Sequence, residues 1–182
     1  IDEIIEIFDL SQILRHNARF DMDKLKWMNY EYTRLMNDER FYELCIIALE
    51  KAGFNLKNYS TEYIEAALDT CRGKIKLFSE LPVYGGFYFK EEVNYDEEAV
   101  KTYFIPENKL YINKLRDAFN QLSEFTAEQI ESVFKSTAKE LGVKVGVLVH
   151  PIRLACTGAT VGPSLYHLLE ILRKEKVITR LD

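Results

Sequence analysis

The chain has 182 residues, a formal net charge of −5, and a composition that is 47% hydrophobic. This apolar content is sufficient for a packed core and excludes a disordered chain. The net negative charge argues against a general nucleic-acid-binding protein, and no apolar run is long enough to cross a bilayer. The first residue is Ile1, inside what reads as an amphipathic helix, so we expect a piece of a longer protein.

The cysteines and histidines do not have the spacing of a metal site. The cysteines are far apart and form no CxxC pair, so we expect buried, reduced thiols of a cytoplasmic protein rather than a disulfide framework or a zinc site. The histidines are too scattered to form a metal motif. These residues are Cys45, Cys71, Cys156, His16, His150 and His167.

Apolar spacing predicts helices in the first half of the chain. A short helix covers residues 1–8, and another begins after Asp21, whose carboxylate can cap it. Trp27 lies at the edge of the apolar face of this second helix, and we expect it to pack in the core. A third helix is expected over residues 38–52, followed by a glycine that stops it.

Between residues 60 and 95 a long stretch of helical apolar spacing is followed by a segment without it. Apolar residues recur at steps of four and three, which predicts one long helix over residues 60–80 with Ser60 as its cap. Residues 83–89 contain two adjacent glycines and four aromatic residues. They predict either a linker packed against a helix or a short strand, and we place the domain boundary there.

The remaining pattern is also helical. We expect helices at about residues 96–104, 107–122, 126–141, 146–157, 163–173 and 174–181. The alternating valines of residues 145–149 are a weak strand signal, and a helix start fits them equally well. The fold class is therefore predicted to be all-α, with two helical bundles in series. The predicted organisation is residues 1–82 as the first subdomain, 83–95 as a connecting segment and 96–182 as the second subdomain.

Residues 150–165 predict a short helix, a glycine stop and a second helix start. Pro151 and Pro163 each suit the first position of a helix, and Gly158 suits the left-handed residue after a helix end. Two helix N-termini would then lie close together and could bind an anion or a base edge. The alternative is a plain helix–turn–helix corner.

The charge distribution bears on this choice. Residues 144–182 hold six basic and three acidic residues, a net charge of +3, whereas the remainder has a net charge of −8. Either this is chance clustering on solvated helix faces, or it is a functional patch.

No motif indicates an active site in this chain. The phosphate-binding, dinucleotide-binding, HExxH and GxSxG patterns are all absent. Cys156 and His150 are close enough in sequence for a Cys–His pair, but Cys156 falls on the apolar side of a short helix, which favours a buried structural thiol. We therefore expect no catalytic residue and no metal ligand here.

Two motifs at opposite ends of the chain resemble the bacterial glutamyl-tRNA synthetase family. Residues 20–34, FDMDKLKWMNYEYTR, are similar to the family's FD..KL.W.N..YIR segment. Residues 150–158, HPIRLACTG, with GP at 162–163 and LLEIL at 168–172, resemble the family's PLR.ALTG…P.LFEIL ending. The resemblance covers essentially the whole chain in order. It implies the C-terminal anticodon-binding half, built as an all-α, α-helix-cage type domain.

The resemblance implies a class I synthetase that ligates glutamate to tRNA(Glu) with ATP and Mg²⁺. The family's two ATP-handling signatures, HIGH-like and KMSKS-like, are absent from the sequence. We therefore expect the catalytic domain to lie outside this chain, and this chain to bind no cofactor of its own. Its expected partner is tRNA(Glu), and also tRNA(Gln) if the enzyme is non-discriminating; no membrane or DNA is expected.

The resemblance also implies which residues face the anticodon. Arg153 matches the arginine of the PLR motif, where a guanidinium at a helix start can bond a base edge. His150 stands where family members often place a polar residue facing the bases. Gly162, Pro163 and Leu165 match a second helix start whose backbone groups and apolar side chain line the base pocket.

Two positions depart from the family pattern. Lys74 stands where many members carry an arginine that inspects the third anticodon base, and lysine lacks the planar fork for a bidentate contact. Either the neighbouring Arg72 substitutes, or Lys74 is an ordinary surface lysine. Arg173 occupies a position that is usually glycine. Lys24 and Lys26 are candidates for contacts to the tRNA backbone, although ordinary surface lysines fit them equally.

The rival interpretation is a non-catalytic helical protein-interaction domain of an acidic cytosolic protein. The overall negative charge favours it slightly. It predicts no salt-dependent RNA binding, whereas RNA contacts weaken steeply as salt rises.

Overall fold

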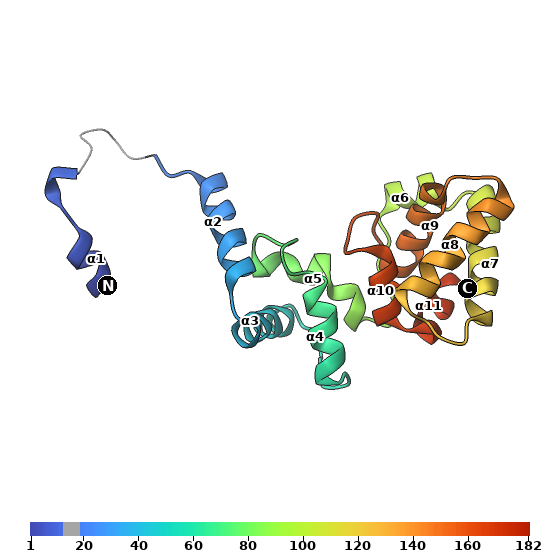
Figure 1. Cartoon of the computed structure of the whole chain (residues 1–182), viewed down its shortest axis with the longest axis horizontal. Coiled ribbons are helices and arrows are strands. Elements are labelled where there is room, and N and C mark those ends of the chain that lie inside the picture. Colours follow the sequence, from blue (N-terminus) through green and yellow to red (C-terminus); the bar gives the residue numbers. More distant parts are fainter. Residues whose placement is uncertain (13–18) are drawn as a thin grey trace.

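The computed structural model describes residues 1–12 and 19–182. Within them it contains helices and no strand, which confirms the predicted all-α class. Figure 1 shows α1 apart from the rest of the chain, followed by two groups of helices side by side. We call residues 22–89, from α2 to η3, the first helical group and residues 97–181, from α6 to α11, the second.

The α-helices are α1 Asp2–Ile7, α2 Met22–Leu35, α3 Asp38–Lys51, α4 Thr61–Asp69, α5 Leu81–Tyr84, α6 Glu97–Tyr103, α7 Pro106–Gln121, α8 Ala127–Leu141, α9 Val145–Thr157, α10 Leu165–Leu172 and α11 Lys174–Leu181. Three short 3₁₀ helices accompany them, η1 Leu10–Gln12, η2 Phe78–Glu80 and η3 Gly86–Phe89.

The first helical group is organised around α3. Asn37 caps α3 by accepting the backbone N–H of Arg40 at 2.9 Å. Phe41, Cys45 and Leu49, at steps of four along one face, are fully buried. Helices α4 and α5 and the 3₁₀ helix η2 pack against α3, so its apolar stripe forms the centre of this group.

The long helix predicted over residues 60–80 is too long. Ser60 caps α4 as expected, but α4 ends at Asp69. Gly73 then has a φ of 66°, in the left-handed region, and the chain turns there. Cys71 is still fully buried. The apolar spacing therefore predicted which side chains are buried, although the helix ends at Asp69 and the left-handed turn at Gly73 follows it.

Residues 83–89 do not form the strand that was one of the two alternatives. They lie in α5 and η3, and the aromatic residues of η3 are buried. The adjacent glycines are required by close packing, since a Cβ on Gly85 would lie 2.7 Å from Sγ of Cys71 and one on Gly86 would lie 2.6 Å from the Phe54 ring. This segment is therefore part of the packed first group.

Helix α2 exposes much of its apolar surface. Asp21 caps it, with a carboxylate oxygen accepting the N–H of Lys24 at 3.0 Å. Trp27 is 58% exposed and Leu35 is 75% exposed. The expectation that Trp27 packs in the core is wrong for the described residues, because α2 contacts its group on another side, where Thr33 is buried.

The core of the second helical group is formed by five helices, with a sixth packed against one of them. Helices α7 to α11 pack on one another, and α6 packs on α9. Thr126 accepts the N–H of Gln129 at the start of α8, and Gly142 ends α8 with a φ of 69°. These ends agree with the helix expected at about residues 126–141. Phe119 and Phe134 are fully buried with rings 6.0 Å apart.

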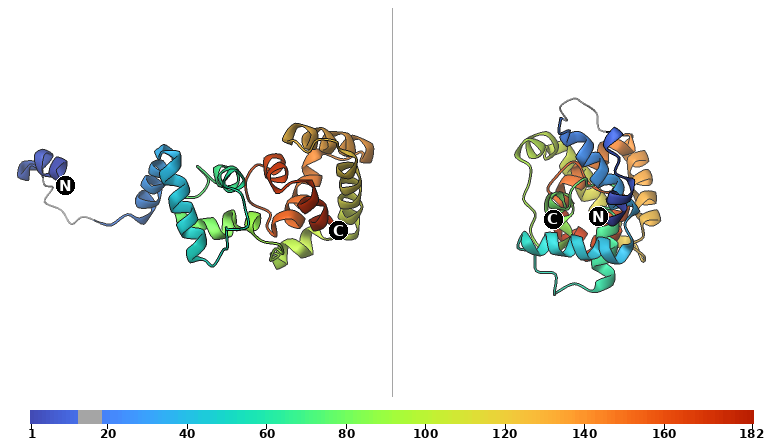
Figure 2. Two further views of the ribbon diagram at one scale, coloured as in Figure 1. Left: turned by 90° about the horizontal axis from the view of Figure 1, so that it is seen from below. Right: turned by 90° about the vertical axis from the view of Figure 1, so that its left-hand side faces the viewer.

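The two groups are in contact. Helix α4 packs on α10, and the buried apolar side chains of both groups form one continuous cluster. The left view in Figure 2 shows the groups adjoining along the long axis of the molecule. The subdomain boundary over residues 83–95 remains a prediction.

Candidate functional site

Helix α9 carries the central part of the predicted site, but it begins earlier than Pro151. It starts at Val145 with Lys144 as the capping residue, so Pro151 lies inside the helix. Proline has no N–H to donate, which leaves the carbonyl of Val147 without its usual helical partner. The prediction that Pro151 occupies the first helical position is wrong, because the valines before it continue the helix rather than form a strand.

Arg153 consequently lies in the middle of α9 and not at a helix start. Its side chain is directed inward and the residue is 9% exposed. Nη1 donates a hydrogen bond of 2.7 Å to the carbonyl oxygen of Pro163. Burial lowers the pKa of Arg153 below its ordinary value, since the charged form loses hydration. The guanidinium thus ties α9 to the segment before α10.

That segment, residues 159–164, places Gly162 and Pro163 beside Arg153. A Cβ on Gly162 would lie 3.2 Å from Nη1 of Arg153, so the backbone there lies against the guanidinium. Helix α10 begins at Leu165, which places Pro163 two residues before the helix rather than at its first position. Pro163 and Leu165 are both buried. The second predicted helix start is therefore real, with Ser164 as its cap residue.

Gly158 ends α9 as predicted. Its φ is 81°, and a Cβ there would lie 2.1 Å from the carbonyl oxygen of Asn94. The carbonyl of Gly158 accepts the N–H of Asp96 at 2.9 Å. Only glycine fits this left-handed position and this close approach of two backbones.

His150 lies on the exposed side of α9. Its ring stacks on the ring of Tyr103, with centroids 5.2 Å apart and an interplanar angle of 23°. Tyr103 ends α6, so the two rings form a small aromatic surface between these helices. The arrangement leaves polar and aromatic edges open to solvent, the features that bind unstacked bases.

Arg72 and Lys74 lie in the turns after α4, in the first group. The guanidinium of Arg72 covers the Phe41 ring at 4.1 Å, donates to the Met36 carbonyl at 3.0 Å and lies 2.9 Å from the Asp38 carboxylate. These contacts hold it to its own group. Lys74 is exposed. Of the two residues, Lys74 is therefore the freer to contact a ligand.

Lys24 and Lys26 lie on the first turns of α2. Lys24 is exposed, and Lys26 is half-buried. Figure 1 shows α2 at the end of the first group that is farther from the second group. The structure does not bring these two lysines to α9.

Sequence reasoning missed Tyr84, which comes from α5 of the first group. Burial raises the pKa of Tyr84, and the positive charge of Arg153 opposes this rise. In Figure 1 the loop before α10 lies on the side of the second group that faces α5. No spacing signal in the sequence connects residues 84 and 153.

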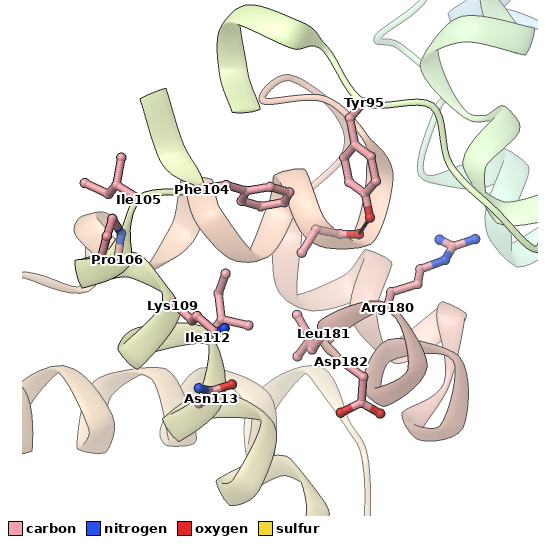
Figure 3. A pocket seen from close by; sticks show the side chains of 11 residues that line it. Tyr95, Phe104, Ile105, Pro106, Lys109, Ile112, Asn113, Arg180, Leu181 and Asp182 are labelled. Atoms are coloured by element: carbon pink, nitrogen blue, oxygen red, sulfur yellow. Dashed lines mark hydrogen bonds between the residues drawn. The ribbon is translucent and has the colours of Figure 1, made fainter. Parts of the chain in front are cut away.

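A separate cavity of about 440 Å³ lies in the second group. Figure 3 shows the rings of Tyr95 and Phe104 on one side of it and Ile112 and Leu181 on the other. Its wall includes Ala155 of α9, but among the described residues it includes neither His150 nor Arg153. This cavity therefore does not coincide with the predicted site.

The described residues contain no group of metal-binding side chains. His16 lies outside those residues. Cys45, Cys71 and Cys156 are all free and buried, as expected. No helix in the described ranges is both long and apolar enough to traverse a bilayer.

The all-α fold, with its α9–α10 corner, can be compared with known protein families. A protein-family model described as an anticodon binding domain matches residues 40–182, and the chain belongs to this family. Over its whole length the chain is similar to glutamate–tRNA ligase 2 of Caldicellulosiruptor saccharolyticus, with 32% identity over 182 residues that make up 38% of that protein. It is also similar to the glutamate–tRNA ligase of Methylacidiphilum infernorum, with 36% identity over 181 residues, all of this chain and 41% of that protein.

A solved structure agrees with these relatives. The glutamate tRNA ligase from Elizabethkingia meningosepticum superposes with a TM-score of 0.83 and 28% identity, covering 99% of this chain and 35% of that one. These findings confirm the family resemblance predicted from the two end motifs. The chain spans about two fifths of the length of the curated relatives it matches.

Proposed function

We propose that this chain is the anticodon-reading module of a glutamate–tRNA ligase. The observation that carries the proposal is the family match over residues 40–182 combined with similarity to such ligases along the entire chain. The partner is then a tRNA, specifically tRNA(Glu). The module works in the cytoplasm, where tRNA is charged for protein synthesis.

The reading surface in this proposal is the α9–α10 corner. His150 offers an exposed ring beside Tyr103 for stacking or hydrogen bonding. The backbone around Gly162 and Pro163 offers N–H and C=O groups that discriminate base edges. The buried side chain of Leu165 supports that segment. Arg153 holds the segment in place through Pro163 and presents its residual exposed edge to a base.

Lys74 serves the third anticodon base in this proposal. As an exposed ammonium it can contact phosphate or a single base atom, but not a base edge in bidentate fashion. Arg72 is held by Phe41 and Asp38, so it substitutes only if those contacts break. Recognition of the third base would then be loose, and tRNA(Gln) becomes a second partner.

Lys24 and Lys26 contact the tRNA backbone.

The whole enzyme would join glutamate to tRNA(Glu) with ATP and Mg²⁺. Those ligands belong to a catalytic part that the longer relatives have room for and this chain does not include. The chain's own contribution is binding and orientation. It holds the anticodon loop so that the acceptor end is directed to the catalytic part.

A binding titration tests this proposal. The chain is titrated with the anticodon stem-loop of tRNA(Glu) and with a copy whose middle anticodon base is changed. We expect tighter binding of the unchanged loop, with affinity falling as salt rises. Weak binding alone does not contradict the proposal, since a separated module loses the avidity of the whole enzyme. Equal affinity for the two loops does contradict it.

The exposed apolar surface of α2 favours the second candidate, a protein-interaction domain. Trp27 and Leu35 would then contact a protein partner. This candidate predicts that the chain binds no RNA at any salt concentration. The same titration, repeated at low and high salt, therefore separates the two.

A further inference from the structure

Helix α11 presents a row of cations to the first helical group. Lys176 and Arg180, four residues apart, share one face of α11, and Arg173 directly precedes the helix. The guanidinium of Arg173 lies 5.7 Å from the centroid of the Tyr63 ring, and the ammonium of Lys176 lies 5.6 Å from that of Tyr59. Both rings belong to the start of α4 and the turn before it.

Arg180 makes the most specific contacts of this row. Within the described residues its hydrogen bonds all go to backbone carbonyl oxygens: Nη1 donates to Cys156 at 2.5 Å, and Nη2 donates to Phe87 at 2.8 Å and to Lys90 at 2.6 Å. One planar group thus joins the last turn of α9 to the end of the first group. Lys176 adds a bond of 3.2 Å from Nζ to the carbonyl of Tyr88.

These bonds differ in kind from the apolar contact between the groups. Apolar contact is non-directional and imposes no hydrogen-bond geometry of its own. Charge-assisted hydrogen bonds fix distance and angle, and the fork of an arginine fixes them in two directions at once. Breaking them leaves a half-buried cation without partners, which is unfavourable. Arg180 therefore adds a directional constraint to the apolar contact between the groups.

We propose that Arg180, assisted by Lys176, is a positioning residue that holds α9 at a fixed angle to the first helical group. This inference rests on the proposed function for its consequence. His150 and Arg153 are on α9, whereas Lys74 is on the first group, so one anticodon loop meets all three only when that angle is held. We call the contacts of Arg180 and Lys176 with residues 87–90 and 156 the carbonyl clasp.

Spin-label distances test the carbonyl clasp. Labels are placed at the exposed positions Lys57 and Lys139, one in each group, after both are replaced by cysteine. The parent chain is expected to give one narrow distance distribution. Arg180→Gln is expected to broaden it, and Arg180→Lys to broaden it also, because lysine keeps the charge but loses the fork.

The matched control is Arg116→Gln. Arg116 pairs with Asp182 at 2.9 Å inside the second group, so its loss removes an arginine contact without touching the clasp. The control distribution should stay narrow. An Arg180→Gln distribution as narrow as that of the parent chain overturns the proposal. If Arg180→Gln loses its helical circular dichroism, Lys176→Gln provides the same test, with broadening in support and an unchanged distance against.

RNA binding distinguishes positioning from mere stability. In folded Arg180→Gln, the preference for the unchanged anticodon loop over the altered one should fall about tenfold, the equivalent of one charge-assisted hydrogen bond. Salt-sensitive binding common to both loops should persist. If the parent chain shows no preference, the proposed function fails, while the distances still decide whether Arg180 fixes the angle.

Discussion

The guanidinium of Arg153 donates its Nη1 hydrogen to the carbonyl oxygen of Pro163 across 2.7 Å. This bond spans ten residues of sequence and closes the corner between α9 and α10. It also shows why an arginine of the anticodon motif is 9% exposed: much of its side chain supports the segment that follows. Under the proposed function, the residue that supports this segment is also the one that contacts a base.

Replacing Arg153 should therefore affect both folding and binding. Arg153→Ala removes a buried hydrogen bond from a charged donor, which should lower the free energy of unfolding by about 1.5–3 kcal/mol in a urea titration. It should also weaken binding of the cognate anticodon loop by about 1–3 kcal/mol, the range for arginines that contact bases. A variant with full stability and full RNA affinity would show that neither role exists.

Replacing Lys74 should affect binding only. Lys74→Ala removes an exposed cation, so stability should change by less than about 0.5 kcal/mol. The slope of log affinity against log salt should decrease by about 0.7 if one phosphate contact is lost. Lys139→Ala on α8, also an exposed lysine, is the control. Identical slopes for the two variants would place Lys74 outside the interface.

Gly158 and Gly142 form a matched pair for testing the close approach of Gly158 to Asn94, in the segment before α6. Both are left-handed, with φ of 81° and 69°, so alanine at either costs about 1–3 kcal/mol of unfolding free energy. At Gly158 the added methyl would also lie 2.1 Å from the carbonyl of Asn94, whereas nothing lies within 4 Å at Gly142. Gly158→Ala should be clearly the more destabilising in thermal unfolding. Equal losses would contradict the close approach.

Among the residues that the structure describes, Arg173 is the one non-glycine residue with a positive φ. Its φ of 68° and ψ of 157° lie in a region that is essentially restricted to glycine. Arg173→Gly should raise the free energy of unfolding by about 1 kcal/mol, because the relief of strain exceeds the loss of the contact with Tyr63. Arg173→Ala keeps the strain and loses the contact, so it should be less stable than the parent chain. Calorimetric melting of the three proteins gives the order directly.

Alkaline pH should destabilise the chain through its buried thiols. Burial raises the pKa of Cys45 and of Cys156 to about 12, and that of Cys71 to about 11. In the unfolded chain these thiols ionise near their ordinary value of 9.0. Since the folded pKa is the higher one, the stabilisation is complete below about pH 9 and is lost as pH rises towards 12.

Urea unfolding at pH 8 and pH 10 measures this effect. Replacing Cys156 by alanine should make the loss of stability between the two pH values smaller. A loss that is the same in the parent and the variant would assign the alkaline sensitivity to other groups, such as the buried tyrosines.

Most helix positions were predictable because local signals agree with the tertiary contacts. The caps Asp21, Ser60 and Thr126 and the stop at Gly142 each bond or turn as their residue types indicate. The failure at residues 60–80 has a local cause, since Gly73 was outweighed by a regular apolar pattern on either side of it.

The site was less predictable because it depends on contacts between distant segments. Pro151 reads as a helix start, yet the valines before it complete a helix whose burial offsets the missing bond. The inward direction of Arg153 and the approach of Tyr84 depend on how the two groups meet, which spacing does not encode. The row of cations on α11 was visible in the sequence at steps of three and four, but its carbonyl partners lie up to 93 residues away.

Helix α6 is attached to α9 at both of its ends. The N–H of Asp96 bonds to the carbonyl of Gly158, and the ring of Tyr103 stacks on His150. At 1.5 Å per residue, these anchor points are about 12 Å apart along α9 and about 10 Å apart along α6. The two spans match, so α6 cannot slide along its antiparallel neighbour without breaking both anchors. His150, in the middle of α9, and Gly158, at its C-terminal end, are thus connected both through α9 and through α6.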